Sequence, residues 1–88
     1  MYKVNLTSKA RKELKRIDRQ HAIAITKWLM TNVDNSVNPR AFGKQLTGAL
    51  SDKWSYRVGD YRILADIEDK VLVVHAVKIG HRREVYER

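Results

Sequence analysis

The sequence contains no cysteine, one proline, one phenylalanine and four glycines in 88 residues. Without cysteine the chain has no disulfide, no thiolate zinc site and no cysteine nucleophile, which fits a reducing compartment. No apolar run approaches the roughly 20 residues that span a bilayer. Residues 1–16 also hold no uninterrupted apolar segment of the kind that a signal peptide needs. We therefore expect a cytoplasmic protein with no membrane partner.

Acidic residues are scarce relative to basic ones. Lys and Arg number 18 and Asp and Glu number 10, which gives a formal net charge of +8. The excess is greatest in residues 1–20, where seven Lys and Arg stand against two Asp and Glu. A polyanion is therefore the expected partner, with nucleic acid ahead of a membrane, although such charge can also serve only to solvate the surface.

The length of the chain suits one domain, and a hydrophobic share of 43% is ordinary for a folded protein. No internal repeat, low-complexity tract or linker interrupts the sequence. We therefore expect a single domain over residues 1–88.

Hydrophobic spacing predicts one strand and two helices in the first half. Residues 2–6 alternate between apolar and polar, as a half-buried strand does. Thr7 or Ser8 can cap a helix whose apolar residues fall on one stripe. Asp18 can cap a second helix, which ends before the breakers in residues 31–39. The first helix carries a basic outer face that consists of Lys9, Arg11, Lys12, Lys15 and Arg16.

From residue 53 onward the hydrophobic period changes to two, as expected of strands. Gly59-Asp60 predicts a two-residue hairpin turn of type II′ between two such runs. Residues 71–79 are apolar nearly throughout, which is typical of a central strand covered on both faces. The sequence therefore predicts an α+β fold. An N-terminal strand and a two-helix hairpin pack on one face of a roughly four-stranded, mainly antiparallel sheet, followed by a short C-terminal tail.

The hairpin turn determines which residues face each other. Counting back from it places Arg57 opposite Arg62, on the face turned away from the helices. On the same face Lys53 is opposite Asp66, a pair of unlike charge. Two like charges directly opposite destabilise a strand pair by up to about 1 kcal/mol. An anion between the guanidinium groups removes that cost, whereas without one both side chains extend into water, and the basic chain favours the anion.

Chemistry-bearing residues also follow the last strand. Gly80 is expected to release that strand at the sheet edge. The side chains that follow, His81, Arg82 and Tyr86, would then gather beside the arginine pair. Guanidinium groups stabilise the extra charge of a pentacoordinate phosphate, while His or Tyr moves protons or stacks on a base. The residues form a candidate phosphodiester site, and since no His, Asp or Glu spacing suggests a metal site, we expect no metal and no other cofactor.

Taken together, these residues resemble the RelE/ParE superfamily of bacterial toxins. The resemblance rests on W-x-Y-R-V-G-D-Y-R from Trp54 and on G-H-R-R-E-V-Y from Gly80, and it covers essentially the whole chain. It implies a small α+β toxin that is neutralised by a cognate antitoxin, usually acidic where it covers the toxin. In the RelE branch the toxin enters the ribosomal decoding site and cleaves messenger RNA. The 2′-hydroxyl attacks the adjacent phosphate and leaves a 2′,3′-cyclic phosphate and a 5′-hydroxyl.

The resemblance also implies roles for particular residues. Arg57 and Arg62 match the basic residues at the scissile phosphate. Arg82 matches the arginine that stabilises developing charge or assists the leaving group. Tyr86 matches the tyrosine that stacks on the substrate base and helps to orient the 2′-hydroxyl. His81 lies where relatives carry Lys, Arg or His, and it is the one obvious base at neutral pH.

One position departs from the family pattern. Some relatives have a second lysine two residues before Arg57, where this chain has Ser55, so the identity of the general base stays open. Lys53, on the same face, is expected to give electrostatic support. Lys44 and the basic face of the first helix are expected to contact RNA phosphates in a salt-sensitive way. His75, inside the last strand, is expected to be a hydrogen-bonded structural histidine.

We therefore expect a metal-independent, ribosome-dependent endoribonuclease whose partners are an antitoxin, the ribosome and messenger RNA. It would reach operator DNA only through the antitoxin, as a corepressor. Two alternatives stay open. A ParE-like toxin of the same fold inhibits DNA gyrase and lacks the nuclease residues. A non-catalytic module would bind nucleic acid or its antitoxin without cleaving RNA.

Overall fold

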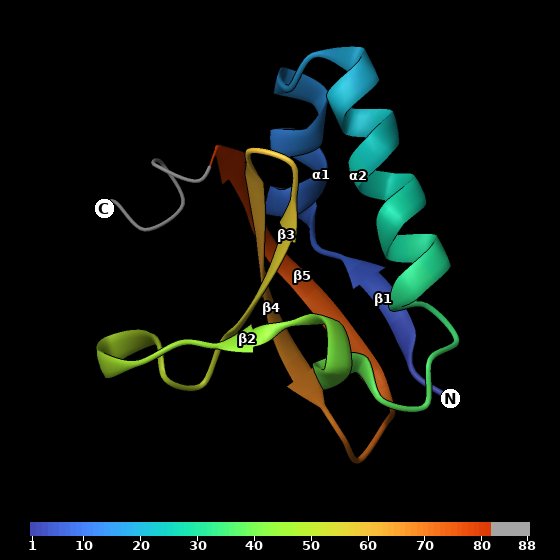
Figure 1. The fold of residues 1–88 in the computed structure, drawn as a ribbon, viewed down its shortest axis with the longest axis vertical. Helices are drawn as coiled ribbons and strands as arrows, with labels where there is room; N and C mark the ends of the chain where they lie inside the picture. Colours follow the sequence, from blue (N-terminus) through green and yellow to red (C-terminus); the bar gives the residue numbers. More distant parts are fainter. Residues whose placement is uncertain (82–88) are drawn as a thin grey trace.

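Figure 1 shows the computed structural model of the chain, which describes residues 1–81. A short strand leads into two helices, and the rest of the described chain forms strands joined by turns. The elements in chain order, with η for a short 3-10 helix, are β1 (Lys3–Leu6), α1 (Ser8–Arg16), α2 (Arg19–Asn32), η1 (Pro39–Phe42), β2 (Lys44–Gln45), η2 (Gly48–Leu50), β3 (Trp54–Val58), β4 (Tyr61–Glu68) and β5 (Val73–His81).

The strands form one mixed sheet in the order β1-β5-β4-β3-β2. β1 runs parallel to β5, and the other neighbouring pairs are antiparallel. The sheet therefore has five strands where the sequence predicted roughly four, because the two residues of β2 pair with β3. A strand of two residues has no hydrophobic period, so the pattern could not indicate it. The predicted α+β class, with its helix pair and mainly antiparallel sheet, is confirmed.

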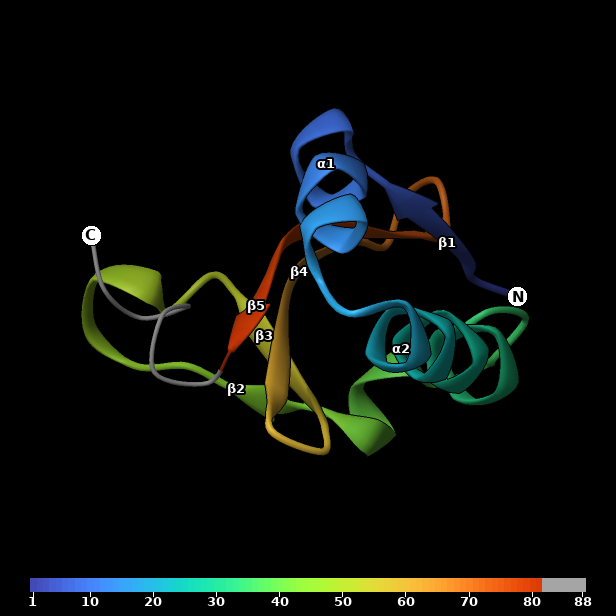
Figure 2. The same ribbon diagram turned by 90° about the horizontal axis from the view of Figure 1, so that it is seen from above.

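Both helices pack on the same face of the sheet, as the view from above shows (Figure 2). Their buried side chains meet those of alternate residues along the strands. We call the opposite face, which carries no α-helix within residues 1–81, the open face. The core cluster consists of Ala10, Ile25, Leu29, Val33, Tyr56, Ile63, Ala65, Val74, Ala76 and Ile79.

Each helix begins at a side-chain cap that the sequence indicated. Thr7 Oγ1 accepts a hydrogen bond from the Ala10 amide at 3.2 Å. Asp18 accepts one from the Gln20 amide at 3.2 Å. These caps satisfy amides that have no partner inside the helix. Within residues 1–81, neither helix has the length and apolar character needed to cross a bilayer.

The β3–β4 hairpin has the register that its turn predicts. Arg57 pairs with Arg62, on the open face. Gly59 has a φ of +60° and Asp60 has no positive φ, which is the type II′ pattern. Glycine is favoured there because other residues rarely adopt a positive φ. The prediction of two arginines directly opposite each other is confirmed.

The last strand differs from its prediction at both ends. It begins at Val73, because the chain turns directly before it. It continues to His81, so the expectation that Gly80 releases the strand is wrong. Gly80 stays in the ladder opposite Arg62 because β4 starts at Tyr61, directly after the hairpin turn, and offers a partner along its whole length.

A bulge in β5 changes which side chains reach the open face. The register of β4 and β5 shifts at Val77, which has no paired residue on β4. Ala76 before this bulge and Ile79 after it both lie in the core. Strict alternation from Ala76 would place Lys78 beneath the helices. Because of the bulge, Lys78 instead lies on the open face, paired with Leu64.

Leu29→Ala is expected to lower the free energy of unfolding by about 2–5 kcal/mol, because the Leu29 side chain is 1% exposed and belongs to the core cluster. Urea denaturation measures the loss. The control is Ile23→Ala on the same helix, where the side chain is 56% exposed and a loss of about 0.5 kcal/mol or less is expected. Equal losses for the two variants would contradict the packing of α2 on the sheet.

Candidate active site

Two rows of side chains cross the open face, because residues that pair across strands share a face. The row nearer the hairpin turn joins Arg57 of β3, Arg62 of β4 and Gly80 of β5. The second row joins Lys44, Ser55, Leu64 and Lys78, from β2 to β5. Taken together, the two rows bring one Lys or Arg from each of the strands β2 to β5 to the same region.

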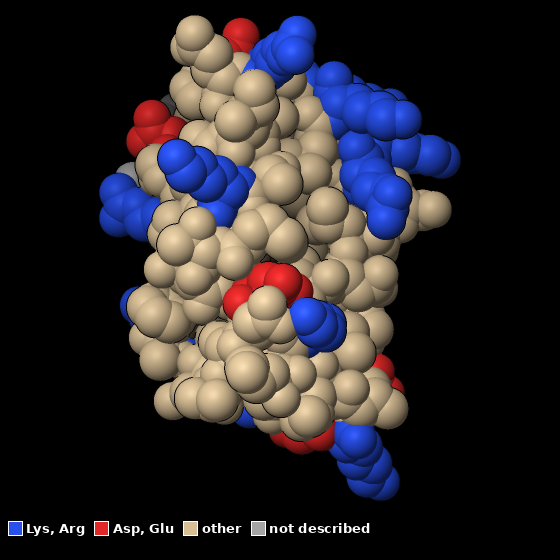
Figure 3. All heavy atoms as spheres, turned by 90° about the vertical axis from the view of Figure 1, so that its right-hand side faces the viewer, with Lys and Arg blue, Asp and Glu red and all other residues tan. Residues whose placement is uncertain are grey.

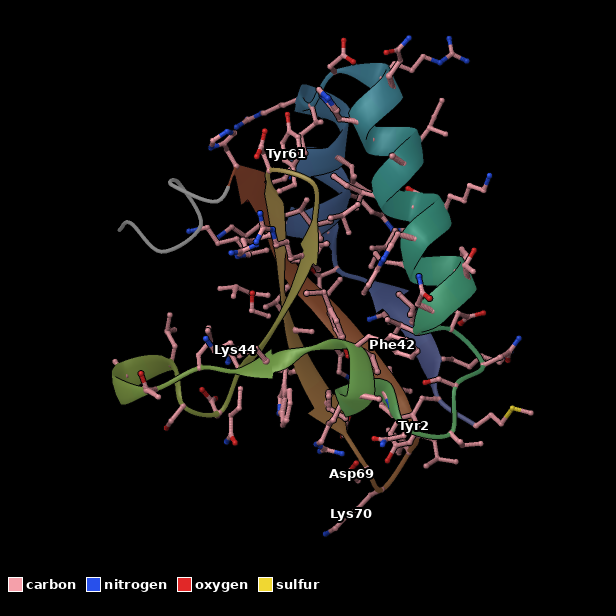
Figure 4. All side chains as sticks on the ribbon, viewed as in Figure 1. Tyr2, Phe42, Lys44, Tyr61, Asp69 and Lys70 are labelled. Atoms are coloured by element: carbon pink, nitrogen blue, oxygen red, sulfur yellow. The ribbon has the colours of Figure 1, made fainter. Side chains whose placement is uncertain are left out.

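A cleft of about 720 Å³ lies over the part of these rows that β2, β3 and Arg62 of β4 supply. One wall is the β3–β4 hairpin, and the other is the segment of residues 44–53, which we call the strap. Lys44 stands where the strap leaves the sheet edge (Figure 4). Among residues 1–81, no Asp or Glu lines the cleft. The lining residues are Lys44, Gln45, Leu46, Thr47, Leu50, Ser55, Arg57 and Arg62.

The two arginines of the cleft have unlike surroundings. Arg57 is exposed, and its Nε donates to the Gly59 carbonyl at 3.3 Å. Arg62 is partly buried, and within residues 1–81 its Nη1 is buried without a hydrogen-bond partner. A buried donor that lacks an acceptor costs about 1–3 kcal/mol, and more when it is charged. The unpartnered Nη1 and the like-charge pair both favour an anion at this point, which stays a prediction.

Lys53 lies on the open face but is already paired. Its Nζ is 2.9 Å from Asp66 and 3.0 Å from Asp52, so the predicted Lys53–Asp66 pair is confirmed. Hydrogen bonds to Asp66 and then to Asp52 raise the pKa of Lys53, which keeps it protonated at neutral pH. Two carboxylates therefore offset the charge that Lys53 was expected to lend to the arginine pair, and a protonated lysine does not act as a general base.

His81 lies on the helix side of the sheet. It pairs with Tyr61, and the two ring centroids are 5.9 Å apart. His21 of α2 lies 5.2 Å from the Tyr61 ring on the same side, and the three rings line a cavity of about 360 Å³. Tyr61 and Arg62 are neighbours on one strand, so their side chains point to opposite faces. The structure therefore does not bring His81 together with the Arg57–Arg62 pair.

The histidine inside β5 is hydrogen-bonded on both sides, as expected of a structural one. His75 Nδ1 is 3.1 Å from the Asn5 amide nitrogen, and its Nε2 is 2.8 Å from a Glu68 carboxylate oxygen. Because the amide donates to Nδ1, the hydrogen of the neutral ring is on Nε2 and is donated to Glu68. His75 thus links β1, β4 and β5 at the far end of the open face from the hairpin.

Some predicted site residues lie outside this cleft or outside the described chain. Arg82 and Tyr86 lie outside the described residues, and their roles stay predictions. Lys78 was not indicated by the sequence, because the bulge that turns it to the open face depends on the pairing with β4. The structure does bring together three of the residues predicted from the sequence, namely Lys44, Arg57 and Arg62.

The basic residues of α1 are all exposed. None of them is among the residues that line the cleft. Figure 3 shows Lys and Arg gathered at the end of the molecule that the helices form. RNA at this helix would involve a different segment from RNA in the cleft, and this contact stays a prediction. Within residues 1–81, no three His, Asp or Glu side chains lie close enough together to hold a metal ion.

An ion-pair network anchors the loop that leads into the strap. Arg40 of η1 donates two hydrogen bonds to Asp69, at 3.0 and 2.9 Å, and its guanidinium lies 5.6 Å from the centre of the Trp54 ring. The Tyr2 hydroxyl also donates to Asp69 (Figure 4). The hydrogen bonds from Arg40 and then from Tyr2 lower the pKa of Asp69. The network ties η1, directly before β2, to the turn between β4 and β5.

Tyr56 and Gly43 fix the same loop from the core side. The buried Tyr56 hydroxyl donates to the Pro39 carbonyl at 2.6 Å. Burial raises the pKa of Tyr56 to about 12, so it stays protonated at neutral pH. A Cβ at Gly43 would lie 2.9 Å from the Tyr56 ring, so only glycine fits directly before β2. The strap thus leaves the sheet from a firmly packed base.

Asp69→Asn is expected to make folding less sensitive to acid. Because the pKa of Asp69 is lowered in the folded state, its carboxylate stabilises the fold above its ordinary value of 3.8, and this contribution is lost as the pH falls through the folded value. Between about pH 6 and about pH 3, the free energy of unfolding should therefore fall less in the variant than in the wild type. Urea titrations measure this, with Asp60→Asn as the control. Equal falls in the wild type and Asp69→Asn would contradict the expectation.

Comparison with known proteins identifies similar chains. Residues 4–86 match the family described as ParE toxin of type II toxin-antitoxin system, parDE. Toxin RelG of Mycobacterium tuberculosis (strain ATCC 25618 / H37Rv) is 31% identical over 87 residues, which cover 99% of this chain and 98% of that protein. Toxin RelE of the same strain is 32% identical over 85 residues, which cover 97% of this chain and 86% of that protein.

A solved structure has the same fold. It is the crystal structure of the toxin-antitoxin complex RelBE2 from Mycobacterium tuberculosis, in which one chain is 28% identical to this one with a TM-score of 0.84. The match covers 92% of this chain and 98% of that chain. The similarity therefore extends over the helices and the sheet alike.

Proposed function

This chain belongs to the RelE/ParE superfamily of toxins from type II toxin–antitoxin systems, and from that premise we propose that it is an endoribonuclease that cuts messenger RNA on the ribosome. The observation that carries the proposal is the Arg57–Arg62 pair in a cleft whose described lining has no acidic residue. Such a cleft suits a phosphodiester, whose negative charge increases as the reaction proceeds. Guanidinium groups supply that charge stabilisation, so the proposed reaction uses no metal ion.

The proposed reaction is an attack of the ribose 2′-hydroxyl on the adjacent phosphate. A bond forms between the 2′-oxygen and phosphorus, and the bond from phosphorus to the 5′-oxygen of the next nucleotide breaks. The 2′-hydroxyl gives up its proton, and the departing 5′-oxygen takes one up. The products are a 2′,3′-cyclic phosphate and a 5′-hydroxyl, so neither water nor a cofactor is consumed.

Arg62 and Arg57 stabilise the pentacoordinate phosphate in this mechanism. The guanidinium of Arg62, which lines the cleft, donates to a non-bridging oxygen, and that of Arg57, directly opposite, donates to the other. The phosphate charge also removes the repulsion between the two guanidinium groups. A preorganised donor of this kind contributes about 10²–10³ in rate.

Proton transfer falls to groups beyond the described cleft. Within residues 1–81 the lining has neither a His nor a carboxylate, and Lys53 is held protonated by its two acidic partners. By the family resemblance, Arg82 assists the departing 5′-oxygen and Tyr86 orients the 2′-hydroxyl. His81, which lies on the helix side, is the histidine closest to Arg82 along the sequence. Ribosomal RNA that holds the message in place would raise the rate further by orienting the 2′-hydroxyl.

An antitoxin is the proposed inhibitor of this activity. The RelBE2 structure is described as a toxin-antitoxin complex, and we assign this chain a cognate antitoxin of the same kind. The formal net charge of +8 favours an acidic toxin-binding segment. Operator DNA would be bound by the antitoxin, with this chain as corepressor.

A gyrase inhibitor is the second candidate, because the matching family carries the ParE name. A gyrase inhibitor would have the same fold and would likewise be neutralised by a cognate antitoxin. Gyrase inhibition gives no role, however, to two arginines held opposite each other. It also does not explain why Arg62 has a buried nitrogen without a hydrogen-bond partner within residues 1–81. The nuclease function accounts for that arrangement, so it is the one we propose.

Mapping of RNA 5′ ends in cells separates the candidates. The chain is induced without antitoxin, and ends are mapped within minutes. We expect new 5′ ends inside translated reading frames, in phase with codons, which disappear when translation is blocked beforehand. Intact messages together with stalled replication would replace the nuclease by the gyrase inhibitor. Neither effect would leave a non-catalytic binding module.

A further inference from the structure

The cleft has two chemically different walls. The hairpin wall carries the guanidinium groups of Arg57 and Arg62. The strap wall carries, beside the polar side chains of Lys44, Gln45 and Thr47, the aliphatic ones of Leu46 and Leu50. Both leucines are only partly buried, so they keep apolar surface open to the cleft. A site for a bare anion has no use for such a wall, because apolar surface offers an anion no favourable contact.

A nucleotide has the same division as the cleft. Its phosphate is charged, while its base has apolar faces and a polar edge. The volume of about 720 Å³ lies within the range of about 300–1,000 Å³ that is usual for small-ligand sites, so phosphate and base both fit. With the phosphate on the arginine pair, a flanking base lies against the strap.

Backbone hydrogen bonds hold the strap in shape. The Leu46 amide donates to the Lys53 carbonyl at 3.1 Å, and the Lys53 amide donates to the Leu50 carbonyl at 2.9 Å. The turn between them has Gly48 at a φ of +67°, which favours glycine. A wall that is already formed loses little conformational freedom when a ligand binds.

Thr47 is placed to contact the edge of a base. It is exposed, lines the cleft and stands at the N-cap position of η2 without making a side-chain capping bond. Threonine at such a position commonly accepts a bond from the following amides. Its hydroxyl both donates and accepts, so it can distinguish bases that present different groups.

We propose that the strap determines which nucleotide is bound beside the scissile phosphate: Leu46 and Leu50 pack against the flanking base, and Thr47 hydrogen-bonds to its edge. The proposal rests on the proposed function, because the phosphate on the arginine pair fixes where the base lies. The ligand is single-stranded RNA, since a base stacked inside a duplex does not present its face to a protein wall.

Binding of short RNAs by the full chain tests the strap. The probes are fluorescent trinucleotides with 2′-fluoro riboses, which lack the attacking hydroxyl, and they carry A, C, G, U or no base at the middle position. All have the same charge, so the arginine pair attracts them equally. Because packing against the leucines removes apolar surface of the base from water, we expect the wild type to bind the best base about tenfold more tightly than the abasic probe. Among the four bases we expect a spread of about three- to tenfold.

Two variants at position 47 assign that spread to the Thr47 hydroxyl. Thr47→Val removes the hydroxyl with little change in shape and is expected to reduce the spread to less than about twofold. Thr47→Ser keeps the hydroxyl and should keep the spread. The matched control is Thr31→Val on the exposed surface of α2, which should leave binding as in the wild type. Leu46→Ala should weaken binding of the base-bearing probes and leave the abasic probe unchanged.

The outcomes separate this inference from the proposed function. Equal binding of abasic and base-bearing probes by the wild type, or no binding of any probe, would overturn the inference even if the chain cuts messages in cells. A spread among bases that Thr47→Val removes and Thr47→Ser retains would support it, even if 5′-end mapping shows no cuts and the nuclease function fails.

Discussion

Arg62→Gln is expected to abolish growth arrest while leaving the protein at least as stable as the wild type. The activity is lost because the variant removes a guanidinium that lines the cleft and, in the proposed mechanism, donates to the phosphate, an effect of about 10²–10³ in rate. Stability is kept because the substitution removes a buried guanidinium nitrogen that has no partner within residues 1–81. It also removes the repulsion between Arg62 and Arg57, which costs up to about 1 kcal/mol. Cell growth after induction measures the first effect, and urea denaturation measures the second.

The control for Arg62→Gln is Lys70→Gln, in the exposed turn between β4 and β5 (Figure 4). It removes the same charge outside the cleft, so growth arrest should persist. A folded Arg62→Gln protein that still arrests growth would take Arg62 out of the site. A loss of stability of several kcal/mol would show that Arg62 serves the fold instead.

Arg82→Ala is expected to abolish RNA cleavage and growth arrest. Its role comes from the family resemblance, in which this arginine stabilises the charge that develops on the leaving 5′-oxygen. Arg82 follows Gly80 by two positions in the sequence. Gly80 pairs with Arg62 in the row of the open face nearer the hairpin turn. Growth after induction and 5′-end mapping both measure the loss.

Arg83→Ala is the matched control for Arg82→Ala, because it makes the same change in net charge one residue away. We expect Arg83→Ala to arrest growth as the wild type does. Loss of activity in both variants to the same degree would point to overall charge near the end of the chain, and would remove the specific role from Arg82.

The parts of the fold that depend on neighbouring residues were predictable from the sequence. The type II′ turn at Gly59-Asp60 involves four consecutive residues, and it alone sets the Arg57–Arg62 register. The caps at Thr7 and Asp18 are likewise local. The most informative feature of the candidate site, an arginine facing an arginine, therefore follows from a short stretch of chain.

Features that depend on distant partners were not predictable. The bulge at Val77 reverses the facing of Lys78, and it exists only in the pairing of β5 with β4. His81 lies beside Tyr61 because β5 runs two residues beyond its predicted end.

The arginine pair shows a conflict between stability and the proposed function. A strand pair selected for stability alone avoids like charges opposite each other and buried donors without acceptors. Such violations are expected where a ligand supplies what the protein lacks. In the proposed function a phosphate satisfies Arg57 and Arg62 together, which is why we assign the reaction to the cleft rather than to the three-ring cavity near His81.

Cleavage of a defined message on purified ribosomes tests the nuclease function most directly. Ribosomes are paused at one codon of a labelled message, the purified wild-type chain is added, and the product ends are analysed. We expect one cut at the paused codon, with a 2′,3′-cyclic phosphate and a 5′-hydroxyl, and no cut when the attacking nucleotide is replaced by its 2′-deoxy form. Cleavage of the 2′-deoxy message, a 5′-phosphate on the product, or an intact message would contradict the mechanism.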